Sequence, residues 1–292
     1  MIKVIEISSD ANLASFSQYL TAQGVYHRLT EERLNQVLWV DSEAAATFVR
    51  LAFEKYQAGE LEVNVTVNHT NSFVSGLTAA MRRFPLTLVL IALNILLFPV
   101  GMVWNELGND SLFARLMLLE IEQVGGDYYF VPLGQTLAEG QWWRLLTPML
   151  IHFSWLHIVF NLLWVWEIGR RIEVINGTLA LFWLVAVASV MANGTQFMMS
   201  GPGFFGGMSG VVFGLLGHSL VWSRLVPERT AGVASGIYIF MLIYLAVGFT
   251  GAIDLLGLGK LANGAHLGGL IAGLVTGGLA ALSVRFRVGS AE

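Results

Sequence analysis

The chain has 292 residues, of which 55% are hydrophobic and only 12% are charged, and its formal net charge is −4. This composition, with a mean hydropathy of +0.65, is typical of a membrane protein rather than a soluble globular one. The sequence contains no cysteine, which excludes disulfides, thiolate catalysis and cysteine-based zinc sites.

Residues 1–64 predict a small soluble α+β domain. Their nine acidic and five basic residues hold the whole charge imbalance, which argues against nucleic acid or anionic lipid as a partner of this region. No catalytic constellation is present in it. Residues 65–82 are predicted to be a linker, because their first part is polar and rich in Asn, Ser and Thr. We expect strands over 1–8 and 34–40, a helix from a Ser9 or Asp10 cap to about Gln23, and a helix over 42–58.

Residues 83–285 predict an all-α polytopic bundle of six transmembrane helices, because a helix needs about 20 apolar residues to cross a bilayer. Arginine pairs flank alternate ends of these segments, whereas the opposite ends hold only Arg115, Arg144 and Lys260. By the positive-inside rule, both termini are cytoplasmic. The six apolar segments run over 86–104, 146–168, 178–198, 209–222, 235–253 and 265–284.

The first outer loop, about 105–145, is long for a compact bundle. Its stretch 111–121 has the apolar content of an interfacial helix, and Trp142, Trp143 and Arg144 suit the headgroup level. We therefore expect this loop to lie partly in the membrane edge.

The fourth apolar segment is too short to cross the membrane fully. It offers about 14 residues between Ser209 and Arg224, or about 21 Å of helix, which is roughly 10 Å less than the hydrocarbon thickness. With Arg224 at the inner surface, Ser209 lies below the outer one, after irregular backbone at 200–205. Such backbone is tolerated at that depth only where protein shields it or a cavity holds water.

Glycine spacing predicts which helix packs against this segment. Small residues three or four positions apart on one helix face let a second helix approach to backbone contact. Contact between the fourth and sixth apolar segments through such faces would bring Ser209 beside His266. The two matching faces are Gly210, Gly214 and Gly217 on the fourth segment and Gly269, Gly273 and Gly277 on the sixth.

Polar residues within a membrane are candidates for function. Ser209 can attack a peptide carbonyl if His266 takes its proton, and no Asp or Glu lies near enough to orient the imidazole, which predicts a dyad. His157 and Asn161 share one helix face and can donate to the developing oxyanion, together with the Ser209 amide at the helix start. His152 either belongs to the site or organises the loop.

With these residues in hand, the chain resembles the rhomboid family of intramembrane serine proteases, and specifically its bacterial members. Four motifs carry the resemblance, in order and on the right segments: Trp143-Arg144, His152-x4-His157-x3-Asn161, Gly207-x-Ser209-Gly210 and Ala265-His266-x2-Gly269-x3-Gly273. The first 64 residues resemble the cytoplasmic domain of such proteins. The tyrosine that usually follows the family's serine by four residues is Phe213 here.

The resemblance implies a serine endopeptidase without metal or cofactor, located in the bacterial inner membrane. Its partners would be the lipid bilayer and transmembrane substrate proteins, which it would cut at small residues in helix-destabilising contexts. Ser209 would be the nucleophile and His266 the base, in a water-filled cavity open to the periplasm, with His157 and Asn161 in the oxyanion site. The fifth segment would gate substrate access, and the residues expected to contact substrate are Phe160, Met208, Phe240 and Tyr244.

Two other functions are weighed against this one. A metal transporter would use His152, His157 and His266 as ligands, yet it would also need carboxylates or thiolates along a path through the bilayer. A proteolytically inactive relative that only binds would lack the serine or the histidine, and both are present.

Overall fold

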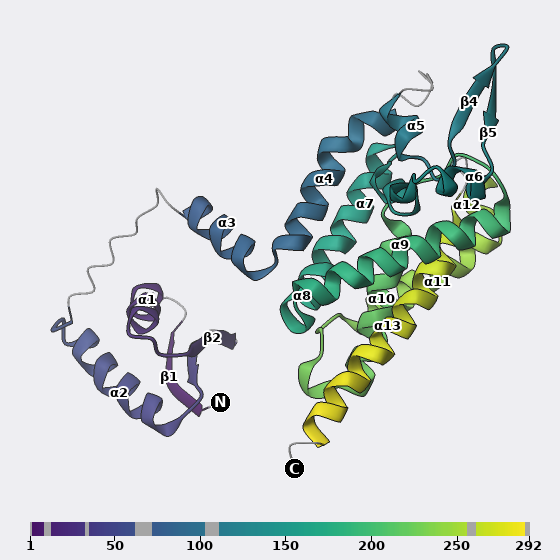
Figure 1. The fold of residues 1–292 in the computed structure, drawn as a ribbon. Helices are drawn as coiled ribbons and strands as arrows, with labels where there is room; N and C mark the ends of the chain where they lie inside the picture. The colour runs from purple at the N-terminus through teal and green to yellow at the C-terminus, as the bar shows by residue number, and fades with distance from the viewer. Residues whose placement is uncertain are drawn as a thin grey trace. The chain divides into compact units, whose positions relative to one another are not determined.

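The computed structural model describes residues 2–8, 13–32, 35–61, 72–102, 111–255 and 261–289. The chain divides into two compact units, Met1–Ser75 and Gly76–Glu292 (Figure 1). Residues 65–71 of the predicted linker lie outside the described residues, whereas from Ser72 onward the chain forms helix α3 (Ser72–Arg83).

The first unit has a three-stranded antiparallel sheet in the order β1-β3-β2 within its described residues. The expected strands and helices are present, but the second strand was not predicted, because its sequence His-Arg-Leu-Thr-Glu-Glu has only one apolar residue. The expected caps Ser9 and Asp10 lie outside the described residues. The elements are β1 (Ile2–Ser8), α1 (Ala14–Ala22), β2 (His27–Glu32), β3 (Asn35–Val40) and α2 (Glu43–Gln57).

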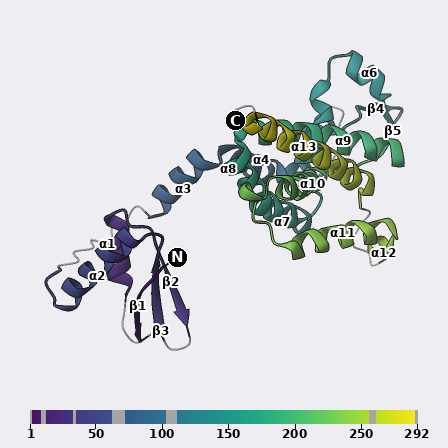
Figure 2. The same ribbon diagram turned by 90° about the horizontal axis from the view of Figure 1, so that it is seen from below.

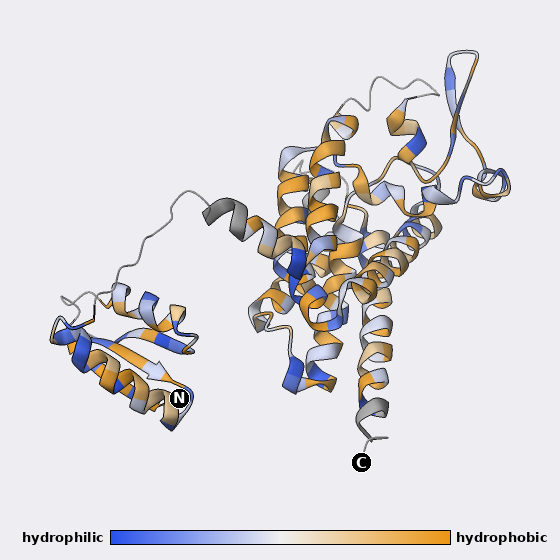
Figure 3. Cartoon of the chain, turned by 60° about the vertical axis from the view of Figure 1, so that its left-hand side comes forward, coloured by the Kyte–Doolittle hydropathy of each residue, from blue (hydrophilic) through white to orange (hydrophobic). Residues whose placement is uncertain are grey.

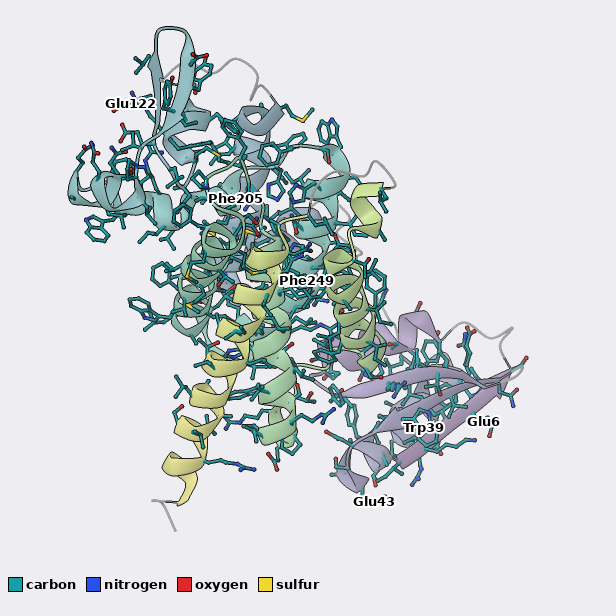
Figure 4. All side chains as sticks on the ribbon, turned by 90° about the vertical axis from the view of Figure 1, so that its right-hand side faces the viewer. Glu6, Trp39, Glu43, Glu122, Phe205 and Phe249 are labelled. Atoms are coloured by element: carbon teal, nitrogen blue, oxygen red, sulfur yellow. The ribbon has the colours of Figure 1, made fainter. Side chains whose placement is uncertain are left out.

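Helix α2 begins where the sequence predicts, because Ser42 caps it: its Oγ accepts the Ala45 N–H at 3.3 Å. The buried side chains of this unit form one core, in which Phe16 of α1 and Leu38 of β3 are fully enclosed. Trp39 lies on the same strand, and its Nε1 donates to Thr30 of β2 at 2.8 Å (Figure 4).

The described residues of the second unit form helices and one short hairpin, joined by irregular segments. Its elements are α4 (Pro85–Met102), α5 (Leu112–Leu116), β4 (Ile121–Val124), β5 (Asp127–Phe130), α6 (Leu133–Ala138), two 3₁₀ turns (Trp142–Leu145 and Thr147–Leu150), α7 (Trp155–Trp164), a π-helical turn (Val165–Gly169), α8 (Arg170–Asn176), α9 (Thr178–Ser200), α10 (Ser209–Leu225), a further 3₁₀ turn (Pro227–Arg229), α11 (Ser235–Phe249), α12 (Ala252–Leu255) and α13 (Asn263–Gly289).

Among the described residues, three helices are long and apolar enough to cross a membrane: α4, α9 and residues 263–285 of α13 (Figure 3). Helix α11 is apolar but has only 15 residues, and α10 has 17. The six-span count therefore stays a prediction.

The second apolar segment forms its helix later than predicted. Residues 146–154 are not α-helical, because Pro148 lies in a 3₁₀ turn and Ser154 caps α7, accepting the His157 N–H at 3.2 Å. From Trp155 the helix then continues through the π-helical turn and α8 to Asn176, and it ends at Gly177, whose φ is +90°. His152 consequently lies in the loop before the helix.

The outer loop also differs from the expectation. Only Leu112–Leu116 of the predicted interfacial helix is helical, and β4 and β5 form an unpredicted hairpin that projects from the unit (Figure 1). The Arg144 side chain is buried within the protein and donates to the carbonyls of Ala114 at 2.6 Å and Met117 at 2.9 Å, so it exposes little surface that could act as an anchor. Burial lowers the pKa of this guanidinium.

Helix α10 forms the centre of the second unit. It runs beside α13, α9 and α7, and every residue from Gly210 to Ser219 is buried (Figure 2). A Cβ at Gly269 would overlap the carbonyl oxygen of Gly210, and one at Gly273 would overlap that of Gly214. The predicted contact of the two glycine faces is confirmed.

Candidate active site

Ser209 and His266 lie within hydrogen-bond distance. Ser209 is the first residue of α10, after non-helical backbone at 201–207, and His266 lies in the first turn of α13. The serine Oγ is 2.9 Å from the His266 Nε2. Because backbone contact at Gly210 and Gly269 joins the two helices within one turn of these residues, helix packing sets the distance between the side chains.

Packing holds the His266 ring, and no carboxylate in the described part of the chain bonds to it. The Phe213 ring lies 4.8 Å from it, centroid to centroid, at 31°, and the Tyr244 ring lies 6.0 Å away. The imidazole is 3% exposed, and its Nδ1 has no hydrogen-bond partner among the described residues. Phe213, which stands where the resembled family usually has tyrosine, therefore packs its ring against His266.

Two polar groups meet at the His152 ring. Its Nε2 lies 3.0 Å from Asn161 Nδ2 on α7 and accepts the Met208 N–H at 3.3 Å. Since an acceptor nitrogen carries no proton, the hydrogen of a neutral His152 ring is on Nδ1. The structure thus brings His152, whose role the sequence left open, into contact with Asn161 and with the residue before Ser209.

His157 lies beside the glycine turn that leads into α10. The ring packs against that of His152 at 4.9 Å. A Cβ at Gly207 would meet His157 Nε2 and Cε1, and the φ of +116° at this residue is one that side-chain-bearing residues rarely adopt. Gly207 therefore allows the chain to pass against the histidine and turn into the helix.

Ser209, His266 and His157 line a cavity of about 1240 Å³. Its walls come from α7, α11, the start of α13 and the segment 200–206; Phe205 of this segment lies beside the start of α13 (Figure 4). Predicted site residues that line it are Phe160, Phe240 and Tyr244, together with Ser209, His266, His157 and Asn161.

Met208 is the one predicted contact residue that the structure does not bring to the cavity. Its side chain is fully buried, and its sulfur accepts the Asn94 amide at 3.3 Å. Its side chain therefore offers no surface to the cavity, and the substrate contact predicted for Met208 stays a prediction.

Sequence reasoning missed two residues of this site. Gln196 lines the cavity, and its Oε1 accepts the Ala265 N–H at 3.1 Å. This hydrogen bond holds the first turn of α13 at the residue that precedes His266. Trp164 packs on Phe240 at 6.2 Å between α7 and α11. The signal for Gln196 was present, because it is a polar residue within an apolar segment.

The described residues contain no group of three or more His, Asp or Glu side chains placed to hold a metal ion. Of the three histidines considered as ligands, His152 and His266 each use one ring nitrogen in a hydrogen bond. The transporter alternative has no assembled ligand set in this part of the chain.

The contact of Ser209 with His266 at a cavity between apolar helices is the arrangement expected of an intramembrane serine hydrolase. Residues 139–282 match the Rhomboid domain, and residues 1–67 match the Rhomboid N-terminal domain. The chain is 32% identical to the rhomboid protease GlpG of Photorhabdus laumondii, over 94% of each chain. It is 30% identical to that of Enterobacter sp. (strain 638), over 98% of this chain and all of the relative.

The chain belongs to the rhomboid family. It is a serine endopeptidase of the intramembrane class. The family membership predicted from the four sequence motifs is confirmed.

Proposed function

We propose that this protein hydrolyses peptide bonds within or next to transmembrane segments of other membrane proteins, with Ser209 as nucleophile and His266 as general base. The observation that supports it best is the 2.9 Å separation of Ser209 Oγ and His266 Nε2 at the wall of a large cavity. Such a distance permits proton transfer without rearrangement.

In the proposed reaction, His266 Nε2 takes the hydroxyl proton as Ser209 Oγ attacks the scissile carbonyl. The imidazolium then gives this proton to the leaving amine, and an acyl-enzyme remains. Water, deprotonated by His266, hydrolyses the ester and restores both side chains. No cofactor or metal takes part in these steps.

The oxyanion is proposed to bind between α7 and the start of α10. His157 and Asn161 line the cavity beside Ser209. The Ser209 N–H lies at the start of α10, where amides lack intrahelical acceptors and the helix dipole favours negative charge. Asn161 has a second amide N–H besides the one near His152, and this proton is available to the substrate.

The substrate is proposed to be a transmembrane segment that enters between α7 and α11. Phe160 and Phe240 are about half exposed and line the cavity from these two helices, and Tyr244 lines it one turn beyond Phe240. Apolar walls suit an apolar segment, and the curated relatives are named rhomboid proteases.

The proposed location is the bacterial inner membrane, with both termini in the cytoplasm and the cavity open to the periplasm. Arginine placement supports this orientation. The length of α10 agrees with it, because 17 residues span about 25 Å and leave Ser209 below the opposite surface of a core about 30 Å thick.

Labelling with a fluorophosphonate probe, combined with cleavage of a transmembrane test substrate, tests the assignment. Wild type should react at Ser209 and cleave; Ser209→Ala should do neither, and His266→Ala should lose labelling. Ser223→Ala on the same helix and His218→Ala, a buried histidine away from the cavity, are the matched controls and should keep both. Turnover above background in Ser209→Ala would reject this nucleophile.

A further inference from the structure

Helix α4 carries a buried amide in the middle of an apolar segment. The buried face of this helix consists of Thr87, Leu90, Asn94, Phe98 and Gly101. The Asn94 side chain is fully enclosed, and its Oδ1 has no hydrogen-bond partner among the described residues. A buried carbonyl oxygen without a donor lowers stability, and a leucine in its place would remove this cost. Polar residues at such positions in a membrane helix are candidates for function.

The Asn94 amide nitrogen contacts the residue that precedes the proposed nucleophile. Its Nδ2 donates to the Leu90 carbonyl at 2.8 Å, one turn earlier in α4, and to Met208 Sδ at 3.3 Å. Because the Leu90 carbonyl can only accept, the nitrogen and not the oxygen of the amide faces it, which leaves the second N–H for the sulfur. The Met208 side chain is fully buried, so it has no alternative partner in water.

Met208 connects this contact to the proposed oxyanion site. Its backbone N–H donates to His152 Nε2 at 3.3 Å, and the next amide along the chain is the Ser209 N–H at the start of α10. A shift of Met208 therefore moves the backbone that carries one proposed oxyanion donor. His152 Nε2 also lies 3.0 Å from Asn161 Nδ2, so the same shift reaches the second donor.

Helix α4 is held on both sides of Asn94, which makes it a rigid support. At its start, the Glu173 carboxylate of α8 accepts the Leu86 N–H and the next N–H along α4, both at 2.8 Å. Two turns beyond Asn94, a Cβ at Gly101 would overlap the His152 carbonyl oxygen, so the helix packs directly on that backbone. The same helix thus supports both partners of the hydrogen bond that precedes α10.

We propose that Asn94 is a positioning residue of the protease: its amide fixes Met208 and thereby holds the Ser209 N–H in the direction of the developing oxyanion. This inference rests on the proposed function and adds to it a residue of α4 that touches neither the substrate nor the reacting atoms. The unpartnered oxygen lowers stability, whereas the ordered donor stabilises the transition state.

The test compares steady-state cleavage of the transmembrane test substrate with thermal unfolding, for wild type and Asn94→Leu in micelles. Asn94→Leu should lower kcat about tenfold and change KM by less than about twofold, because a displaced donor weakens transition-state binding and not substrate binding. Its melting temperature should equal or exceed that of wild type, because the unpartnered oxygen is gone. A purely structural role would instead lower the melting temperature and leave kcat unchanged below it.

A double-mutant cycle and a rescue identify the route through Met208. Met208→Leu, which removes the sulfur acceptor, should lower kcat as Asn94→Leu does, and the double variant should lose no more than either single one. Met208→Gln should keep kcat within about twofold of wild type, because its Oε1 accepts the Asn94 N–H and its Nε2 donates to Asn94 Oδ1. Thr276→Val is the matched control and should keep the wild-type kcat, because its hydroxyl lies 3.3 Å from His218 Nδ1, away from the cavity.

Fluorophosphonate labelling separates this inference from the proposed function. Turnover above background in Ser209→Ala would overturn both. If Ser209 is the labelled nucleophile and folded Asn94→Leu keeps the wild-type kcat, only the positioning role is overturned. Additive losses in the double variant, or equal losses in Met208→Gln and Met208→Leu, would overturn it as well. If Asn94→Leu does not fold, the comparison of the two Met208 variants decides, since only Met208→Gln keeps an acceptor for the Asn94 amide.

Discussion

One imidazole nitrogen orients much of the proposed oxyanion site. His152 Nε2 takes the Met208 N–H and lies 3.0 Å from the Asn161 amide, so the loop before Ser209 and the donor on α7 share one partner. His152 is completely buried. A rigid, shared acceptor keeps the second Asn161 N–H pointing in one direction, which is what preorganised stabilisation of a developing charge requires.

Asn161→Ala should lower kcat about 100-fold and change KM little, because removal of one oxyanion donor costs transition-state binding and not substrate binding. The measurement is steady-state cleavage of the transmembrane test substrate at several concentrations, with the melting temperature recorded to confirm folding. A folded Asn161→Ala protein with wild-type kcat would remove Asn161 from the oxyanion site.

At the scale of helices, the contact of α10 with α13 sets the distance between the two proposed catalytic side chains. Gly273→Val should abolish cleavage and lower the melting temperature, because its side chain would overlap the Gly214 carbonyl and force the helices apart. Gly278→Ala is the matched control, since a Cβ there meets only Val221 Cγ1, at 4.0 Å. Full activity in Gly273→Val would show that this contact does not set the geometry.

The cap that α8 provides to α4 is the second interaction at this scale. Glu173→Ala should lower the free energy of unfolding by about 3 kcal/mol, because it leaves buried donors at the start of α4 without an acceptor. Glu228→Ala, at an exposed position, should change it by less than about 0.5 kcal/mol. Both are measured by unfolding in mixed micelles; equal values for the two variants would contradict the capping role.

The sequence predicts those features that a cap residue or a regular residue spacing marks directly. Ser42 before an amphipathic run predicts the start of α2, and the glycine intervals predict the contact of α10 with α13. The hairpin at 121–130 and the late start of α7 were missed, because tertiary contacts decide them. Arg144 shows why. The sequence Trp-Trp-Arg fits both an arginine anchored at a surface and a buried arginine that binds two carbonyls. Only the fold of residues 111–117, which supplies those carbonyls, distinguishes the two.

At the scale of the whole molecule, the two units have separate cores. The buried side chains of the first unit pack with one another around Phe16, and those of the second surround Val212 and Leu216 of α10. All residues that line the cavity belong to the second unit. The first unit matches the Rhomboid N-terminal domain, and this match assigns it no catalytic residue.

Removal of residues 1–64 should therefore leave peptide-bond cleavage intact. The truncated chain keeps every helix that positions Ser209 and His266, and it loses only a core that contributes nothing to the cavity. The measurement is kcat/KM on the transmembrane test substrate in micelles, for full-length and truncated protein, with fluorophosphonate labelling to count active sites. A truncated protein that melts at the full-length temperature, yet neither labels nor cleaves, would mean that the first unit takes part in forming the site.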